Sequence, residues 1–513
     1  MIYDLPWLTI LIVLPLAGAL VTGFLPRGTA LPRHVALGIA VLTLVAAVVM
    51  ATGYDTDGGM QFTEVHEWIN VFGAHYAVGV DGLGLLMILL TTVLVPIVMV
   101  ASWHEDEVAN APAFFAWVLA LQSLSIAVFA ATDVFLFYVV FEATLIPAYF
   151  LIGGFGRVGR TRAAVKFLIY QLAGGLVMLA AVIGLYVVAA DAGNPSYLLT
   201  DLSGIEMSQT AERWLFVGFF IAFAIKAPLF PVHTWLADTT EKATTGTSVL
   251  LVCVLDKIGA FGMLRFCLGL FPEASQWATP VVVVLALVSI VYGALVAIGQ
   301  DDVLRLIGLT SLSHFGLIIL GIFVFSSQGS SGAILYMVNH GIATTLLFLV
   351  AGYLIKRTGT TLISQMGGVE KVAPVLAGVF LVAGLAACGL PGLSPFVSEM
   401  LVIISAFDYA WWAGAVAVTV IVLSAFYALW MYQRTMTGPA LRPEMEGLTD
   451  LNRREVGTVA PLVLALVLFG FYPMPLLDVI NPTADTTLQQ VGVTDDAPEV
   501  SVDGTDAAEE GQD

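Results

Sequence analysis

The chain has 513 residues, of which 59% are hydrophobic and 11% are charged, and its mean hydropathy is +0.94. Soluble domains carry about 25% charged residues, so this composition excludes an ordinary soluble protein and predicts an all-α polytopic membrane protein. The formal net charge is −19, but residues 482–513 hold nine acidic residues and no basic one. Because this one segment accounts for nearly half of the charge, the acidity says little about partners.

The first apolar run begins at the N-terminus, which reads MIYDLPWLTILIVLPLAGAL and has no basic residue before it. A cleaved signal sequence starts with positive charge, so this run predicts a first transmembrane helix instead. A membrane-spanning helix needs about 20 apolar residues. We expect fourteen spans, at 6–24, 32–52, 79–102, 111–131, 133–155, 163–190, 211–229, 243–270, 276–298, 302–325, 330–355, 374–407, 411–437 and 455–480.

Two segments lack the pattern of a span. Residues 59–78 are mixed and aromatic, and aromatic residues gather where membrane meets water, which predicts an interfacial loop. Residues 482–513 contain little that would form a core, so we expect a disordered acidic tail.

Lysine and arginine predict the orientation of the spans, because loops on the cytoplasmic side carry an excess of both. With both termini outside, fifteen of the nineteen basic residues fall in inside loops or at inside ends. The chain is therefore expected to be a multi-pass protein of the cell (cytoplasmic) membrane. The loop HEDEV at 104–108 is acidic yet placed inside, but acidic residues contribute little to this rule.

Two spans are interrupted by glycine and proline: span seven by KAPLFPVHTW and span twelve by CGLPGLSPFVSEM. The breaks lie five spans apart. Because five is odd, two five-helix units, spans 4–8 and 9–13, would have opposite orientations in the membrane. Matched breaks in inverted repeats indicate a transport site, since unpaired backbone is tolerated only where it lines a cavity. The alternative is a pair of ordinary proline kinks.

The expected organisation follows from these repeats. It comprises helices 1–3 in residues 1–110, the first inverted repeat in 111–270, the second in 271–437, helix 14 in 438–481 and the tail in 482–513.

Ionisable residues interrupt four apolar runs near these breaks. They are Glu142, Lys226, Lys257 and Glu399, and Asp256 stands beside Lys257. A charge at the bilayer centre costs roughly 2.5–3.5 kcal/mol on insertion scales, so such residues usually serve a function. A lysine whose charge depends on a movable carboxylate partner is a switch for loading a proton. The alternative is a static ion pair that holds the helices together.

Three histidines accompany these charges. His314 in TSLSHFGLI and His340 in YMVNHGIATT are candidates for a proton relay between Lys257 and Glu399, since histidine titrates near neutral pH. Each is alternatively a hydrogen-bonded packing residue. His233, at the broken span seven, is a possible modifier of proton transfer or a structural residue.

No cofactor or metal is expected in this chain. Cys253, Cys267 and Cys388 are scattered through apolar segments without metal or redox spacing, which disfavours Fe–S clusters, haem attachment and structural zinc. The sequence GFGRVG at 154–159 fits G-x-G-x-x-G, but no strand precedes it, so the dinucleotide-binding context is absent.

Six motifs together resemble a known family. They are VGVDGLGLLM at 78–87, FEATLIPAYFLIGGFG at 141–156, KAPLFPVHTWLAD at 226–238, DKIGAFGMLRF at 256–266, LIGLTSLSHFGLI at 306–318 and LPGLSPFVSEML at 390–401. They resemble the antiporter-like membrane subunits of the proton-translocating NADH–quinone oxidoreductase, respiratory complex I, in its chain M branch. The resemblance covers spans three to thirteen.

The resemblance implies roles for individual residues. Glu142 is similar to the helix-five glutamate that pairs with the helix-seven lysine, here Lys226. Lys257 is similar to the connecting lysine of helix eight, and Glu399 to the terminal proton-transfer glutamate. His314 and His340 match histidines of the central hydrophilic axis.

The resemblance also implies partners and cofactors. The chain would be a subunit of an NADH:quinone oxidoreductase without a redox centre of its own. Chains L and N would be its neighbours in the membrane arm, and NAD, FMN, Fe–S clusters and quinone would be bound by partner subunits. No nucleic acid is expected.

Two alternatives remain: a subunit of an Mrp-type Na⁺/H⁺ antiporter, and a quinone-binding or substrate-transporting membrane enzyme. The sister chains carry a lysine where this sequence has Glu399, which favours the chain M branch. Two departures from the family pattern stand out. The stretch LADTTEKATTGTS at 236–248 replaces a PDAH-like stretch, which puts a proton input route there in doubt, and Asp256 is an added carboxylate.

Overall fold

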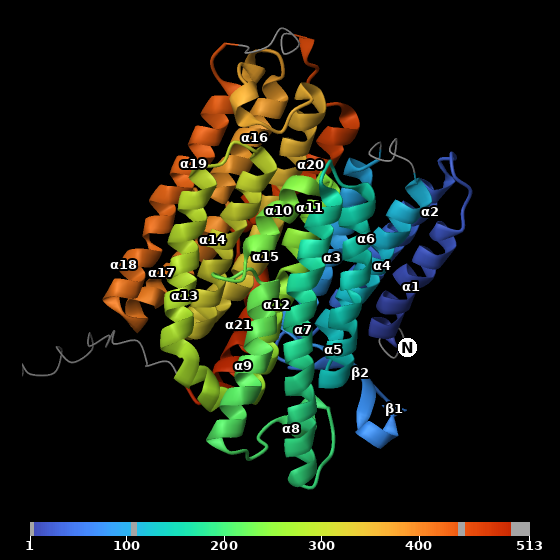
Figure 1. Ribbon diagram of the computed structural model, residues 1–513, viewed down its shortest axis with the longest axis vertical. Coiled ribbons are helices and arrows are strands. Elements are labelled where there is room, and N and C mark those ends of the chain that lie inside the picture. The colour runs from blue at the N-terminus through green and yellow to red at the C-terminus, as the bar shows by residue number, and fades with distance from the viewer. Residues whose placement is uncertain (1–4, 104–109, 440–446, 494–513) are drawn as a thin grey trace, which may run out of the picture.

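The computed structural model describes residues 5–103, 110–439 and 447–493. The acidic loop HEDEV at 104–108 lies outside these ranges. The described chain is a bundle of helices with one small hairpin at its end (Figure 1). The helices are α1 (Trp7–Gly23), α2 (Leu31–Ala51), α3 (Gly82–Ala101), α4 (Ala111–Ala130), α5 (Val134–Ala143), α6 (Leu145–Phe155), α7 (Arg160–Asp191), α8 (Leu199–Leu202), α9 (Gln209–Lys226), α10 (Thr234–Lys242), α11 (Thr245–Leu250), α12 (Lys257–Gly262), α13 (Pro272–Ile298), α14 (Val303–Phe323), α15 (Ser327–Thr358), α16 (Pro374–Ala387), α17 (Ser394–Tyr409), α18 (Trp411–Ala417), α19 (Thr419–Met436), α20 (Arg453–Phe471) and α21 (Met474–Val491).

Most of the longer helices among the described residues could span a membrane. Eleven helical segments there are long and apolar enough to cross a membrane, including α5–α6 and the run from α11 to Leu268 as continuous segments. This confirms the expected helical, polytopic membrane protein. Two shorter apolar helices, α1 and α16, accompany them.

Polar residues before the apolar runs explain where several helices begin. The Asp81 carboxylate accepts a hydrogen bond from Gly84 N at the start of α3, and Asp133 accepts from Leu136 N at the start of α5. Each carboxylate satisfies a backbone donor that the first helical turn leaves free. The sequence therefore marks these helix starts locally.

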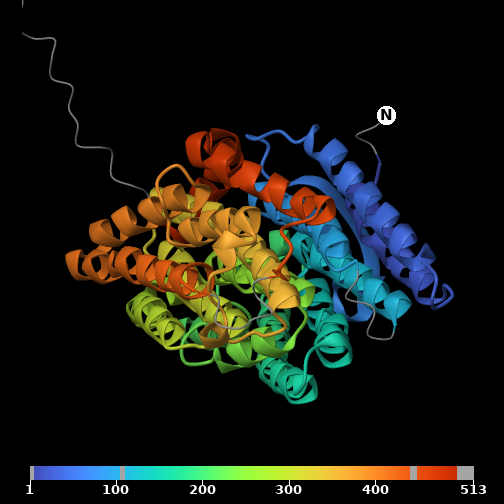
Figure 2. The ribbon, with the colours of Figure 1, turned by 90° about the horizontal axis from the view of Figure 1, so that it is seen from above.

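The burial of the helices identifies the centre of the bundle. The apolar windows of α14, α15 and the segment Thr245–Leu268 are 100% buried, whereas those of α2 and α20 are 28% buried. Seen from above, the N-terminal helices α1 and α2 (blue) lie at one edge, and the orange helices α17 to α19 lie at the opposite edge (Figure 2). Polar groups on α14, α15 and Thr245–Leu268 are therefore shielded from lipid.

Residues 61–80 form a hairpin where a loop was expected. Strand β1 (Gln61–Ile69) pairs antiparallel with β2 (Ala74–Val80), and Gly73 adopts a positive φ of 61° in the turn. The hairpin is tied to α1, because Glu64 accepts hydrogen bonds from Leu8 N at 3.1 Å and from Thr9 N at 3.2 Å. The hairpin therefore lies beside the start of the N-terminal helix (Figure 1).

The C-terminal boundary also differs from the prediction. The expected last span at 455–480 ends at Phe471, and the expected disordered tail from 482 is wrong for its first ten residues, because α21 continues to Val491. One face of α21 is apolar and buried, through Ile480, Ala484 and Leu488. It is also held by polar contacts, such as the hydrogen bond from Gly82 N to Thr483 Oγ1 at 3.1 Å. Residues 494–513 lie outside the described ranges.

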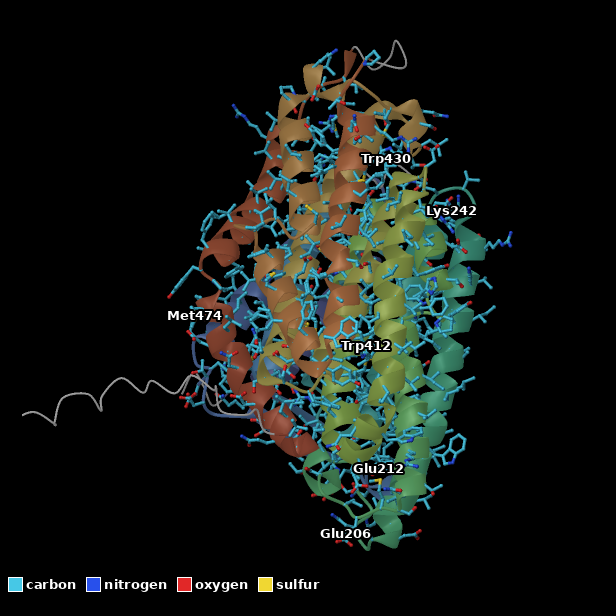
Figure 3. The ribbon with its side chains drawn as sticks, turned by 90° about the vertical axis from the view of Figure 1, so that its left-hand side faces the viewer. Glu206, Glu212, Lys242, Trp412, Trp430 and Met474 are labelled. Atoms are coloured by element: carbon cyan, nitrogen blue, oxygen red, sulfur yellow. The ribbon has the colours of Figure 1, made fainter. Side chains whose placement is uncertain are left out.

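Helices α9 and α10 together run from one end of the bundle to the other (Figure 3). Lys242, at the end of α10, lies toward one end of the molecule, and Glu206 and Glu212 lie at the opposite end (Figure 3). The chain therefore crosses the length of the bundle between residues 212 and 242.

Candidate functional site

The first break lies between α9 and α10, where a break in span seven was expected. Helix α9 ends at Lys226 and α10 begins at Thr234. Side chains satisfy backbone groups that the interrupted helix leaves free: Trp235 Nε1 donates to Ile225 O at 3.0 Å, and Phe230 N donates to Ser289 Oγ at 2.9 Å. These partners hold the non-helical backbone inside the protein, as the bilayer requires.

Lys226 is buried at this break, with 2% of the residue exposed. Its Nζ donates to Thr144 Oγ1 at 3.1 Å and lies 4.4 Å from the centre of the Phe141 ring. Thr144 occupies the turn between α5 and α6. The ammonium group is therefore held by a hydroxyl and an aromatic face rather than by a carboxylate.

Glu142 lies near the end of α5, on the same turn as these contacts. Its Oε1 is buried without a hydrogen-bond partner. Lys226 is the positive charge that acts on Glu142, and Glu142 is the first of the two negative charges that act on Lys226. The structure thus brings the two expected partners together electrostatically, while the lysine makes its hydrogen bond to Thr144.

The central lysine, Lys257, lies between two π-helical segments, η4 (Leu251–Leu255) and η5 (Met263–Leu268). Its Nζ contacts His340 Nδ1 at 2.6 Å and donates to Val252 O at 3.0 Å. Such π-helical turns are frequent at functional sites. The Phe315 ring lies 4.8 Å from the same nitrogen.

Asp256, next to Lys257, is 1% exposed, and its Oδ2 has no hydrogen-bond partner. Asp256 lies close enough to Lys226 and Lys257 for a charge on its carboxylate to act on both lysines. The added carboxylate therefore connects the two lysines electrostatically.

The two histidines expected on the axis lie together. The rings of His314 on α14 and His340 on α15 have centroids 5.2 Å apart. His314 Nε2 lies 3.0 Å from the Tyr427 hydroxyl, whereas His314 Nδ1 and His340 Nε2 are buried without a partner. Since His340 also contacts Lys257, the pair extends the polar centre from α12 toward the second break.

The second break separates α16 from α17 and places Glu399. Helix α16 ends in a turn with Gly389 at a φ of +65°, where Leu390 N donates to Leu385 O at 3.0 Å. Asn339 Nδ2 on α15 donates to Ser394 O at 2.8 Å. Glu399, 3% exposed on α17, accepts a hydrogen bond of 2.6 Å from the Tyr336 hydroxyl. The carboxylate faces the histidine helix α15.

His233 lies in the first break but apart from this polar centre. Its ring stacks on Phe230 at 5.9 Å and meets Tyr292 edge-on at 5.3 Å. Its Nδ1 is buried without a partner. The structure therefore places His233 in an aromatic pocket.

The stretch that departs from the family pattern, LADTTEK, forms most of α10. Its Asp238 pairs with Lys166 at 2.6 Å and with Arg305 at 2.6 Å, and its Glu241 pairs with Arg305 at 2.9 Å. These carboxylates fasten α10 to α7 and α14 at one end of the bundle.

Several site residues give no signal in the sequence. Thr144, Tyr336 and Tyr427 contact the charged or histidine groups, but each stands in an apolar run as an ordinary packing residue would. One weak signal exists: Tyr336 and His340 are four residues apart on α15, so they share a helix face.

Residues 131–424, more than half of the chain, match the protein family described as NADH:quinone oxidoreductase/Mrp antiporter, TM. The chain belongs to this family. The expected family membership is thereby confirmed. The match spans the ionisable groups of the polar centre, which are Glu142, Lys226, Asp256, Lys257, His314, His340 and Glu399.

Members of the NADH:quinone oxidoreductase/Mrp antiporter family are similar over nearly the full length. The chain is 47% identical over 538 residues to the NADH-quinone oxidoreductase subunit M of Mycobacterium tuberculosis (strain ATCC 25618 / H37Rv), covering 97% of each chain. It is 37% identical to that of Rhodobacter capsulatus, covering 94% of this chain and 96% of the relative.

Two solved structures share the fold. A chain of respiratory complex I from Thermus thermophilus with bound NADH superimposes with a TM-score of 0.86 at 33% identity, covering 95% of this chain and 100% of that one. A chain of the Mrp complex from Dietzia sp. DQ12-45-1b gives 0.80 at 23% identity, covering 94% and 99%. The second likeness shows the fold alone.

Proposed function

We propose that this chain is a proton-translocating membrane-arm subunit of an NADH–quinone oxidoreductase. The observation that carries the proposal is a row of ionisable groups at the bundle centre. It runs from buried Lys226 and half-buried Glu142 at one broken helix to buried Glu399 at the other. Relatives named as subunit M of this enzyme match the chain over nearly its whole length. A charge buried in a membrane is costly and marks an ion or proton pathway.

Proton transfer along this row uses groups that touch or face each other. Lys257 Nζ can exchange a proton with His340 across 2.6 Å, and the His340 and His314 rings lie 5.2 Å apart. Tyr336 then presents its hydroxyl to Glu399. Water or side-chain movement has to bridge the steps between these contacts, as in other buried polar networks.

The membrane topology belongs to the same proposal. Counting α9–α10 and α16–α17 as broken spans, and α18–α19 as one span, gives fourteen spans, with inverted repeats in spans 4–8 and 9–13. The residue ranges are 111–270 and 271–437. The excess of lysine and arginine at one set of loops supports a cytoplasmic-membrane location with both termini outside.

Redox chemistry is assigned to partners in this proposal. NAD, FMN, Fe–S clusters and quinone would be bound by other subunits, and antiporter-like chains L and N would be the neighbours in the membrane arm. Electron transfer there would move the charges or helices that change the proton affinity of Lys226 and Lys257. This chain would then contribute proton carriers only.

A second candidate is a subunit of an Mrp-type Na⁺/H⁺ antiporter, since the family description and one solved structure include it. The carboxylate at Glu399, where the sister chains carry lysine, favours the first candidate.

Co-purification tests the proposal. The tagged chain is isolated from membranes in mild detergent, and its companions are identified by mass spectrometry, with NADH–quinone activity and Na⁺ dependence measured on the same sample. Flavin and Fe–S subunits with NADH-driven proton uptake are expected. Recovery of small antiporter subunits with Na⁺-dependent proton exchange would overturn it.

A further inference from the structure

The carboxylate of Glu142 lies directly against the backbone of α7. A Cβ atom added to Gly175 would stand 1.7 Å from Glu142 Oε1 and 2.4 Å from its Cδ, whereas ordinary contacts of this kind begin at 3.4 Å. No larger residue at position 175 leaves the carboxylate where it is. The space that holds Glu142 therefore exists because residue 175 lacks a side chain.

The helix itself gives no reason for glycine at this position. Gly175 lies in the interior of α7, and none of the positive φ angles recorded in the described chain falls on it. Glycine in a helix interior costs about 1 kcal/mol relative to alanine. The contact with Glu142 accounts for a residue that the local backbone disfavours.

One turn earlier, α7 carries a polar group on the same face. Gln171 precedes Gly175 by four residues, the spacing that places two side chains on one face of a helix. Gln171 is 2% exposed, and its Nε2 is buried without a hydrogen-bond partner. Glu142 Oε1 is likewise buried without one. Gln171 on α7 is thus an unpaired hydrogen-bond donor, and Glu142 on the neighbouring helix α5 is an unpaired acceptor.

We propose that Gly175 and Gln171 form a carboxylate seat on α7 that positions Glu142 for proton loading of Lys226. This inference rests on the proposed function and names two positioning residues for it. With the carboxylate in the seat, Lys226 is left to Thr144 Oγ1 and the Phe141 ring. Gly175 provides the room, and Gln171 provides an unpaired N–H donor on the same helix face that one bridging water would connect to the ionised carboxylate.

The second glutamate of the row is seated in the same way. A Cβ atom added to Gly389 would stand 2.1 Å from Glu399 Oε2. Gly389 also has a positive φ of 65°, which favours glycine independently. Gly175 has no such second reason, so it is the position at which the idea is tested.

The test uses the assembled complex in membrane vesicles, with NADH-driven proton uptake normalised to complex content. Gly175→Ala is expected to lower proton uptake about ten- to a hundredfold, because a misplacement of about 1 Å at a reacting group costs up to about a hundredfold. Gln171→Leu is expected to lower it about tenfold. Assembly should be retained in both.

Rescue separates positioning from a general packing defect. Glu142→Asp shortens the side chain by one carbon–carbon bond, about 1.5 Å, so Gly175→Ala combined with Glu142→Asp should pump faster than Gly175→Ala alone. Two other glycine-to-alanine variants serve as controls for Gly175→Ala. Gly154→Ala meets nothing within 4 Å, and Gly174→Ala meets α9 at Ile225 rather than the carboxylate. Glu142→Asp should not rescue Gly174→Ala.

The outcomes distinguish this inference from the proposed function. Normal pumping by Gly175→Ala, in a complex whose Lys226→Ala variant does not pump, overturns the seat and leaves the proposed function standing. Failure of Glu142→Asp to rescue also overturns it. Normal pumping by Lys226→Ala would overturn the proposed function itself.

Discussion

Replacing Tyr336 with phenylalanine would remove one hydroxyl from the bundle centre and leave the aromatic packing in place. That hydroxyl donates to Glu399 Oε1 at 2.6 Å. The ring it belongs to lies 5.9 Å from the His314 ring and 6.3 Å from the His340 ring. Because the phenylalanine ring has the same shape, the substitution isolates the hydrogen bond.

The size of the effect follows from the burial of both partners. A hydrogen bond to a charged group contributes about 1.5–3 kcal/mol, and about 1.36 kcal/mol changes a rate tenfold. Tyr336 is 1% and Glu399 3% exposed, so bulk water does not replace the lost donor. If Glu399 exchanges protons in its ionised form, we expect proton uptake to fall about 10- to 100-fold in Tyr336→Phe.

The assay is NADH-driven proton uptake and quinone reduction in vesicles, both normalised to assembled complex. Tyr432→Phe is the matched control, since its ring stacks on Phe380 at 6.4 Å on the periphery and should leave both rates unchanged. Wild-type rates in Tyr336→Phe would refute the argument that Glu399 depends on this hydroxyl.

Substitutions at four residues test the other parts of the row and of the fold. Lys226→Ala should abolish most coupled turnover while the complex still assembles on a native gel, and normal pumping would remove Lys226 from the path. His340→Ala removes the group 2.6 Å from Lys257 Nζ and should slow proton uptake about 100-fold or more, whereas an unchanged rate would mean that protons bypass it. Glu399→Gln should lose most turnover and Glu399→Asp should keep part of it; a fully active glutamine variant would make the residue structural. Arg357→Met removes the guanidinium that lies 2.6 Å from the buried Glu455 carboxylate on α20. The unpaired carboxylate should destabilise the chain by about 3–5 kcal/mol, measured as a lower melting temperature. An unchanged melting temperature would mean that the pair does not stabilise the fold.

The broken helices and most of the buried charges were predictable because their signals are local. Proline and glycine inside an apolar run interrupt a helix wherever they occur, and a lysine such as Lys226 in that run has no inexpensive location in a bilayer. In the structure α9 ends at Lys226, the first residue of one expected interruption, and α16 ends at Ala387, directly before the other. No knowledge of the tertiary fold was needed for these features.

The contact partners of those charged residues were not predictable, because they lie on other helices and depend on how the helices pack. Thr144 and Tyr427 are neutral residues in apolar runs, where packing explains them equally well. Only the arrangement of α5 beside α9, and of α19 beside α14, gives them a charged or histidine neighbour.

Helix α21 was missed because composition over a long window hides a short periodic pattern. Residues 482–513 are acidic as a whole, yet Ile480, Ala484 and Leu488 recur every four residues, the spacing of one helix face. These residues are buried against the bundle. A shorter window would have separated this amphipathic helix from the acidic residues after it.

The distribution of ion pairs indicates why the central groups can exchange protons. Basic and acidic residues nearer the helix ends are paired, as Lys166 with Asp238 and Arg265 with Asp81, both at 2.6 Å. Among the described residues, the central lysines and carboxylates form no ion pair; their close partners are hydroxyls, a histidine, a carbonyl and aromatic rings. In a low-dielectric interior a direct ion pair would hold both charges strongly. Neutral partners stabilise a charge more weakly, so the proton on Lys226 or Glu399 stays responsive to a charge that moves nearby.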